Sequence, residues 1–331
     1  MRTTSLDHVR LGRALTLGLT AALLGAAATA CGSSAAGPSN GGLPMVSGAV
    51  GQEATIVLPA DVKAPITLST KVLVQGSGSV LADGDLAAVN YTAMDWTGAK
   101  MLGTTYSEDG GKTPNQPQVV TLGAAGLIPA WNKALVGARV GSRIEVVAPP
   151  SQAFGATGNP KAGVTGSDDL VFVLDVVGGY PANADITGTQ TAQAGPGLPQ
   201  ISGNPGTGNP TVTIPGGVKP PTTLVADTLI KGTGATVAKG QTLILQYTGV
   251  DWNTGKNFDS SFTRKQAYDV VIGAGQVIPG WDTGLVGKHV GDRVLLVVPP
   301  AQGYGPSGGE PSVGIGAGDT LVFVVDVIDA L

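Results

Sequence analysis

The chain has 331 residues, of which 52 are glycine and 23 are proline, and only 13% are charged, with a formal net charge of −4. This length suits two modest domains with linkers, and the sparse, net-acidic charge lacks the basic surface by which proteins bind nucleic acid, so we expect no nucleic-acid partner. Histidine occurs only as His8 and His289, which argues against a histidine-rich metal site or a Ser-His-Asp triad, and we expect neither metal nor cofactor.

Residues 1–30 are predicted to be a targeting segment. Arginines precede an apolar run that is shorter than the about 20 residues of a membrane-spanning helix. The run ends in small residues before Cys31, the only cysteine, and this pattern resembles a bacterial lipobox, although Ala28 stands where leucine is usual. The resemblance implies a lipoprotein signal peptide, with Cys31 lipidated and the protein held at the extracytoplasmic face of the cell membrane. The alternative is ordinary signal cleavage with an incidental free thiol, which a secreted protein seldom keeps.

Glycine, serine and proline then divide the rest of the chain into units. Residues 31–42 predict a flexible tether, residues 43–180 a first domain with an N-terminal arm, and residues 181–197 a linker. Residues 198–331 predict a second domain, with its own arm and a core at 222–331.

The two domains repeat the same motifs in the same order. The sequence YTAMDW at 91–96 returns as YTGVDW at 247–252, and LIPAW at 127–131 returns as VIPGW at 277–281. A unit of this length is a domain rather than a solenoid repeat of about 20 to 50 residues. Each copy is therefore expected to close its own core.

Strand patterns dominate both copies. In the second, residues 242–252 alternate in polarity, and residues 320–328 are almost all apolar, which is typical of a strand covered on both faces. One short helix is expected per copy, because Pro279 suits a first helical position and Trp281 and Leu285 share a helix face. A short helix laid across a mainly antiparallel sheet is an α+β architecture.

The motifs of the second copy resemble those of FKBP-type peptidyl-prolyl cis-trans isomerases. The resemblance rests on Tyr247, the FDSS sequence at 258–261, the VIPGWD sequence at 277–282, Pro299-Pro300, Tyr304-Gly305 and the LVF sequence at 321–323. The first copy is similar over residues 67–180, with weaker motifs. The resemblance implies two domains, each an antiparallel β-sheet wrapped around one short α-helix, in agreement with the pattern of elements.

The implied reaction requires no nucleophile. Rotation about an X-Pro bond breaks amide resonance, with a barrier of about 18–20 kcal/mol, and no covalent bond is made or broken. A dry aromatic pocket that holds the proline ring, with a few polar groups that stabilise the twisted amide, is sufficient. By resemblance, the catalytic groups are Phe258, Asp259, the Ile278 backbone N–H and Tyr304. By resemblance, the substrate-binding residues are Tyr247, Tyr268, Val277, Trp281, Ile315 and Phe323.

The resemblance also implies partners. These are proline-containing segments of secreted polypeptides and macrolides such as tacrolimus or rapamycin. Arg264 stands where the family often places the partner of the aspartate corresponding to Asp259. Gln276 replaces a commonly acidic residue whose backbone contacts macrolides, so macrolide binding is a weaker expectation than catalysis.

The first copy keeps the apolar part of this pocket and loses its polar part. By resemblance, its degenerate pocket comprises Tyr91, Leu102, Leu127, Ile128, Trp131, Phe154 and Phe172. Leu102 and Gly103 stand in place of Phe258 and Asp259, and Phe154 stands in place of Tyr304. Such a groove suits peptide holding better than bond rotation, and the alternative is drift in a copy kept for fold stability.

Two functional hypotheses follow. In the first, the protein is an extracytoplasmic isomerase that assists folding, with catalysis mainly in the second domain. In the second, it is a non-catalytic peptide-binding scaffold or chaperone at the cell envelope that uses both grooves. The pair Asp259 and Tyr304 distinguishes them, because a pure binder need not keep either group.

Overall fold

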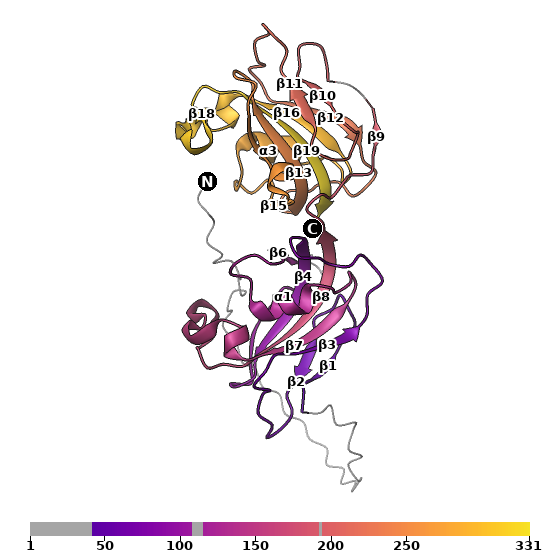
Figure 1. Ribbon diagram of the computed structural model, residues 1–331, viewed down its shortest axis with the longest axis vertical. Helices are drawn as coiled ribbons and strands as arrows, with labels where there is room; N and C mark the ends of the chain where they lie inside the picture. Colours follow the sequence, from indigo (N-terminus) through magenta and orange to yellow (C-terminus); the bar gives the residue numbers. More distant parts are fainter. Residues whose placement is uncertain (1–41, 108–114, 192–193) are drawn as a thin grey trace, which may run out of the picture.

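The computed structural model describes residues 42–107, 115–191 and 194–331. The predicted signal peptide and Cys31 lie outside these ranges. Within them, the chain forms no helix long and apolar enough to cross a membrane. Figure 1 shows two domains of similar architecture, the first in indigo to magenta and the second in orange to yellow.

The first domain is an antiparallel sheet crossed by one helix, as the sequence predicted. The sheet order is β3-β7-β8-β4-β5, and β6 also pairs with β4. The strands are β3 (Ser69–Val74), β4 (Leu86–Asp95), β5 (Lys100–Thr104), β6 (Gln118–Thr121), β7 (Arg143–Ala148) and β8 (Leu170–Tyr180). Helix α1 (Pro129–Leu135) begins at a proline and buries Ala130, Trp131 and Leu135 against the sheet.

The second domain repeats this arrangement. Its sheet order is β14-β13-β19-β16-β12-β9, and β15 pairs with β13. The strands are β9 (Thr189–Gln190), β12 (Val225–Lys231), β13 (Thr242–Asp251), β14 (Asn257–Ser260), β15 (Tyr268–Val271), β16 (Arg293–Val298) and β19 (Leu321–Ala330). Helix α3 (Pro279–Leu285) corresponds to α1, and a small ladder of β17 (Gly309–Glu310) and β18 (Ile315–Gly316) closes the loop after Tyr304. The α+β prediction is confirmed.

One element differs from the expectation of a single helix in the second domain. A one-turn helix, α2 (Ser261–Arg264), follows β14. The Ser260 hydroxyl caps it by accepting from the Thr263 N–H, and Lys265 ends it in the left-handed conformation at φ 52°. A four-residue turn has no hydrophobic periodicity, so the sequence pattern did not reveal it.

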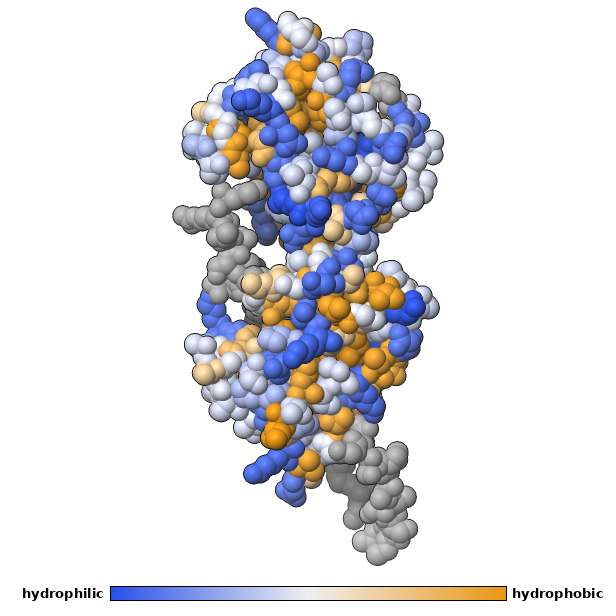
Figure 2. Space-filling view, viewed as in Figure 1, coloured by the Kyte–Doolittle hydropathy of each residue, from blue (hydrophilic) through white to orange (hydrophobic). Residues whose placement is uncertain are grey.

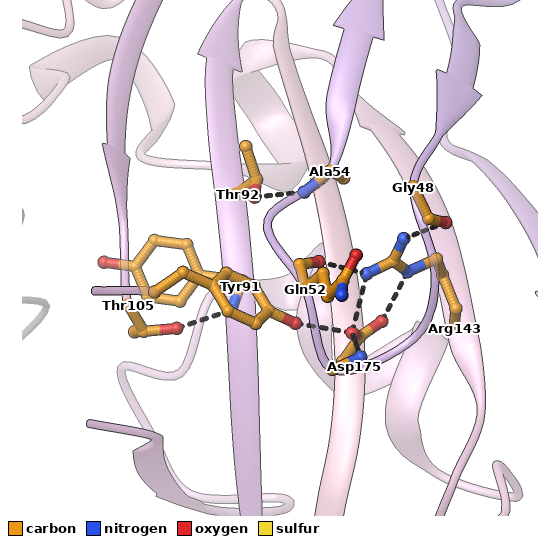
Figure 3. A network of polar contacts seen from close by, with 10 residues as sticks. Gly48, Gln52, Ala54, Tyr91, Thr92, Thr105, Arg143 and Asp175 are labelled. Carbon is orange, nitrogen blue, oxygen red and sulfur yellow. Dashed lines mark hydrogen bonds and ion pairs between the residues drawn. The ribbon is translucent and has the colours of Figure 1, made fainter. Parts of the chain in front are cut away.

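The arms cover the outer faces of the two sheets. Strands β1 (Met45–Ser47) and β2 (Thr55–Val57) form a hairpin over the first sheet, and β10 (Gln200–Ser202) and β11 (Thr211–Thr213) form one over the second. The first arm is fixed by Arg143, which pairs with Asp175 at 2.6 Å and donates to the carbonyl oxygens of Gly48 and Gln52 (Figure 3). Arg293 and Asp326 repeat this buried pair in the second domain at 2.6 Å.

The predicted linker contributes directly to the second domain. Strand β9 pairs with Ile230 and Lys231 at the edge of β12, and the Thr191 N–H donates to the Leu229 carbonyl at 3.0 Å. The polar sequence of β9 gave no strand pattern, and its position is determined by the open edge of β12.

The domains meet at one end of their sheets in a contact that we call the domain interface. Its buried residues are Leu86, Ala88 and Tyr180 of the first domain and Ile244 and Ala267 of the second, flanked by Val119, Ile328 and Leu331. The Tyr180 hydroxyl donates to Asp329 at 2.6 Å, and the Gln266 amide donates to the Thr121 hydroxyl at 2.8 Å.

Candidate active site

The inner face of the second sheet and helix α3 enclose an aromatic cluster with Trp281 at its centre. The Trp281 ring lies edge-on to Tyr247 and Phe323, with centroid separations of 5.3 and 5.2 Å. Tyr268 from β15 contacts Tyr247 at 5.6 Å, and Phe258 from β14 contacts Phe323 at 5.6 Å. Edge-to-face packing of this kind fixes ring orientation and excludes water. The structure therefore brings together the aromatic residues that the sequence predicted.

The aromatic cluster has a buried floor and a rim that solvent can reach. Trp281, Tyr247 and Phe323 are buried, at 4%, 6% and 4% exposure. Phe258 and Tyr268 are only partly buried and pack against this core, so they present ring surface at the rim. This arrangement suits a flat, apolar ring that enters from solvent.

A polar cluster lies beside the aromatic one. The Tyr247 hydroxyl donates to Asp259 Oδ2, and Arg264 pairs with Asp259 Oδ1. Arg264 Nη2 also donates to the Tyr247 hydroxyl at 3.0 Å, and its guanidinium lies 5.3 Å from the Tyr247 ring centroid. Both carboxylate oxygens thus have a partner, so Asp259 is held in one orientation.

Electrostatics keep the Tyr247 phenol protonated. Burial and the hydrogen bond to Asp259 raise the pKa of Tyr247 far above its usual value. The phenol therefore remains a donor to Asp259 throughout the range in which proteins function. Burial also raises the pKa of Tyr304, with smaller contributions from the negative charges of Glu310 and Asp259.

The remaining predicted residues border the same region. Val277, Ile278 and Tyr304 are partly buried and pack against the aromatic core, and Ile315 in β18 is 2% exposed within it. Ile278 directly precedes α3, and its carbonyl accepts from the Trp281 N–H at 2.9 Å. Every substrate-binding and catalytic residue predicted for the second copy therefore contributes to one core and its rim.

The first domain carries a similar cluster. Tyr91 and Phe172 lie 5.2 and 5.7 Å from Trp131, which is 1% exposed. Leu102, Leu127, Ile128 and Phe154 all pack against or within this core. Gly103 pairs with Ala93, as Asp259 pairs with Gly249, which confirms the alignment of the two copies.

Polar partners are missing from the first cluster. The buried Tyr91 hydroxyl has no hydrogen-bond partner among the described residues, whereas Tyr247 has two. Gln118 occupies the register position of Tyr268, a loss that sequence comparison missed because the insertion before β6 obscures the alignment.

Two further residues of the second site were missed. The Ser261 hydroxyl oxygen accepts a hydrogen bond from the Tyr247 N–H at 2.8 Å, which connects α2 to β13. Gly249, which has no side chain, leaves room for the Phe258 ring. The sequence could have indicated Ser261, because both copies carry a hydroxyl residue at this position. In the first copy the Thr105 hydroxyl accepts from the Tyr91 N–H at 2.8 Å.

Both domains match one family of known proteins. The family model described as "FKBP-type peptidyl-prolyl cis-trans isomerase" matches residues 78–177 and 234–328. An "FK506-binding protein" of Streptomyces anulatus is 40% identical over 119 residues, which are 36% of this chain and 94% of that protein. The human "Peptidyl-prolyl cis-trans isomerase FKBP2" is 43% identical over 90 residues, 27% of this chain and 61% of that protein.

Solved structures are also similar. The crystal structure of AtFKBP13 is 31% identical with a TM-score of 0.31, over 34% of this chain and 96% of that one. The two family matches together span more than half of the sequence. The chain belongs to the FKBP-type peptidyl-prolyl cis-trans isomerase family and is an enzyme of that type.

Proposed function

We propose that the second domain performs the isomerisation, on proline-containing segments of polypeptides outside the cytoplasm, and that the first domain does not. The observation that carries this proposal is the Tyr247–Asp259–Arg264 cluster beside an accessible aromatic rim. The first domain has Gly103 at the position of Asp259 and a Tyr91 hydroxyl that lacks a partner in the described residues.

The geometry suits bond rotation. A proline ring that packs among Phe258, Tyr268 and Trp281 is removed from water together with its amide. An apolar surrounding disfavours the charge-separated planar amide more than the twisted one. As resonance is lost, the carbonyl carbon becomes more electron-poor, and the fixed Asp259 carboxylate stabilises it. The Tyr304 hydroxyl and the Ile278 N–H are the donors assigned to the substrate carbonyl groups.

Two substitutions at equivalent positions of the two domains, each made in the full chain, test the location of catalysis. Phe258→Leu gives the second pocket the residue of the first, and we expect it to lower kcat/KM for a prolyl peptide by about tenfold, the equivalent of 1.4 kcal/mol. The matched change in the first pocket, Leu102→Ala, should leave kcat/KM unchanged. A larger loss from Leu102→Ala than from Phe258→Leu would contradict the proposal.

Location outside the cytoplasm rests on Cys31. Lipidation there would anchor both domains to the extracytoplasmic face of the membrane, where secreted chains emerge unfolded. Wild-type protein should then partition with membranes, and Cys31→Ala should be released or left unprocessed. Equal membrane retention of a cleaved Cys31→Ala protein would contradict this anchoring.

Macrolide binding belongs to the same pocket. The relative from Streptomyces anulatus is named for binding FK506. We infer that tacrolimus or rapamycin competes with peptide at Trp281, with affinity reduced by Gln276. Quenching of tryptophan fluorescence in wild type and in Phe258→Leu measures this binding.

A second function, peptide holding by the first domain, is favoured by its surface. Of the thirteen large apolar side chains that are exposed in the described ranges, eleven belong to residues 43–180. Figure 2 displays this asymmetry as a larger hydrophobic area on the first domain. The exposed edge of β3 adds to it, since β3 pairs only with β7 in the described structure, whereas β12 is covered by β9.

Suppression of aggregation of an unfolded test protein measures peptide holding. Val72→Lys and Val74→Lys in β3 should weaken suppression, because they place charge on the exposed strand. Val218→Lys in the second arm is the matched control. Equal suppression by all variants would contradict a holding surface at β3.

A further inference from the structure

Two groups of the second pocket lie on one short segment, residues 261–268, which we call the α2–β15 segment. Arg264 ends α2 and pairs with Asp259, and Tyr268 begins β15 and packs edge-on against Tyr247. The segment is a single helical turn followed by a left-handed Lys265, so it has little stability of its own. Its position depends on what holds its two ends.

The start of the segment is held by the connection between the domains. The fully buried Gln246 donates from Nε2 to the Ala182 carbonyl at 2.8 Å. Its Oε1 accepts from the Ser261 hydroxyl at 2.5 Å, and the Ser261 oxygen accepts from the Tyr247 N–H. A continuous series of hydrogen bonds thus runs from residue 182, directly after the first domain, to the first residue of α2.

The end of the segment is held by the first domain itself. Gln266 donates to the Thr121 hydroxyl on β6, and Ala267 is buried at 4% exposure within the domain interface. Tyr268 is the next residue and packs, partly buried, against the aromatic core. The contact with the first domain is therefore one residue away from a side chain that lines the pocket.

The first domain has no equivalent of this support in the described residues. Asn90 occupies the position of Gln246, and its shorter amide accepts from the Thr105 hydroxyl at 3.0 Å. The stretch that follows Thr105 carries an insertion relative to the second copy. The longer glutamine side chain, which reaches both Ser261 and the connection, is specific to the second domain.

We propose that the first domain and its connection position Arg264 and Tyr268 in the second pocket, through the pairs Thr121–Gln266 and Ala182–Gln246. The first domain then acts on catalysis without touching the substrate. This inference rests on the proposed location of catalysis in the second domain. Thr121, Gln246 and Gln266 are positioning residues in this scheme.

Substitutions at Thr121 in the full chain separate positioning from simple loss of packing. Thr121→Val keeps the size of the side chain and removes the acceptor, whereas Thr121→Ser keeps the hydroxyl. We expect Thr121→Val to raise hydrogen exchange of residues 261–268 and to raise KM for a prolyl peptide, each by about 2- to 10-fold, the equivalent of one neutral hydrogen bond. Thr121→Ser should show the exchange and the KM of the wild-type protein. In Thr121→Val, kcat should change less than KM.

Gln266→Leu, on the other side of the contact, should match Thr121→Val, and the double variant should be no worse than either alone. Gln241→Ala is the matched control, because the Gln241 amide donates to Ala330 within the second domain. Unchanged exchange of residues 261–268 in Thr121→Val would overturn the proposal. Raised exchange with unchanged KM would overturn it too, since the contact would then hold the segment without positioning the pocket.

The exchange measurement also separates this proposal from the location of catalysis. If Phe258→Leu leaves kcat/KM unchanged while Thr121→Val raises exchange in residues 261–268, then catalysis lies elsewhere and the KM part of this proposal fails with it. If Phe258→Leu lowers kcat/KM and Thr121→Val changes neither exchange nor KM, only the positioning role fails.

Discussion

Gly249 lies directly against the ring of Phe258. A Cβ atom at residue 249 would stand 2.6 Å from Phe258 Cε2, closer than Cβ atoms come to other atoms in proteins, and 3.1 Å from Phe323 Cε1, which is a tight contact. In the first domain the same positions hold Ala93 and Leu102, so the larger residue on β4 accompanies the smaller one on β5. In the first domain, the Ala93 side chain thus occupies the space that the phenylalanine ring fills in the second.

Gly249→Ala should therefore displace Phe258 from the pocket rim. Overpacking of this kind costs about 1–3 kcal/mol, and we expect kcat/KM to fall by about tenfold or more. Gly216→Ala is the control, since a Cβ there meets no atom within 4 Å. Steady-state kinetics on both variants check this, and equal activity would show that the rim position of Phe258 does not matter.

The fold could be predicted because its signals are local and repeated, whereas the aromatic residues of the site were expected from the resemblance of their motifs to a known family. The strands have clear alternation, and Trp131 and Trp281 each follow a proline that begins a helix. Compensating pairs could not be predicted, because they join residues far apart in the chain. In the second domain Gly280 faces Val298, whose Cγ1 would lie 2.5 Å from a Cβ atom at residue 280. In the first domain the equivalent positions hold Ala130 and the smaller Ala148.

The contacts between domains were also beyond sequence pattern. Gln246 and Gln266 are polar residues in unremarkable positions, and their roles depend on Ala182 and Thr121. Only the relative placement of the two domains reveals these partners. Prediction from the sequence thus failed for contacts between residues far apart in the chain, both within one domain and between the two.

Glu145 should make stability depend on pH. It is 2% exposed, neither carboxyl oxygen has a hydrogen-bond partner in the described residues, and burial raises its pKa above the usual value while Lys71 opposes this. The folded state therefore favours the protonated acid. Stability from this group is fully present below the unfolded pKa near 4.5 and is lost as pH rises through the higher folded pKa.

Replacing Glu145 by leucine, the residue at the equivalent position 295, should remove this dependence. We expect Glu145→Leu to raise the free energy of unfolding at neutral pH by about 1–3 kcal/mol, the cost of a buried unsatisfied polar group. Urea unfolding of both proteins from about pH 4 to 8 measures it. A wild-type protein that gains stability across that range relative to Glu145→Leu would contradict the assignment.

A second-domain fragment should gain stability from residues before the predicted boundary at 198. A fragment of residues 184–331 keeps β9 and its pairing with β12, whereas 198–331 exposes that edge. We expect both to unfold cooperatively, with the longer one more stable by about 1–3 kcal/mol from two or more backbone hydrogen bonds. Identical urea midpoints would show that β9 adds nothing to the domain.

Graded substitutions in the second pocket should reveal catalysis by shape and polarity rather than by a nucleophile. Tyr304→Phe removes one neutral hydrogen bond, about 0.5–1.5 kcal/mol, so kcat/KM should fall by no more than about tenfold. Phe258→Ala should cost more, because it opens the site to water and removes ring contacts with Phe323. Asp259→Leu should fall between them, since it leaves the Tyr247 hydroxyl and Arg264 without their shared acceptor. A protease-coupled prolyl-peptide assay gives the order, and complete loss of activity in Tyr304→Phe, with Phe258→Ala nearly unaffected, would contradict it.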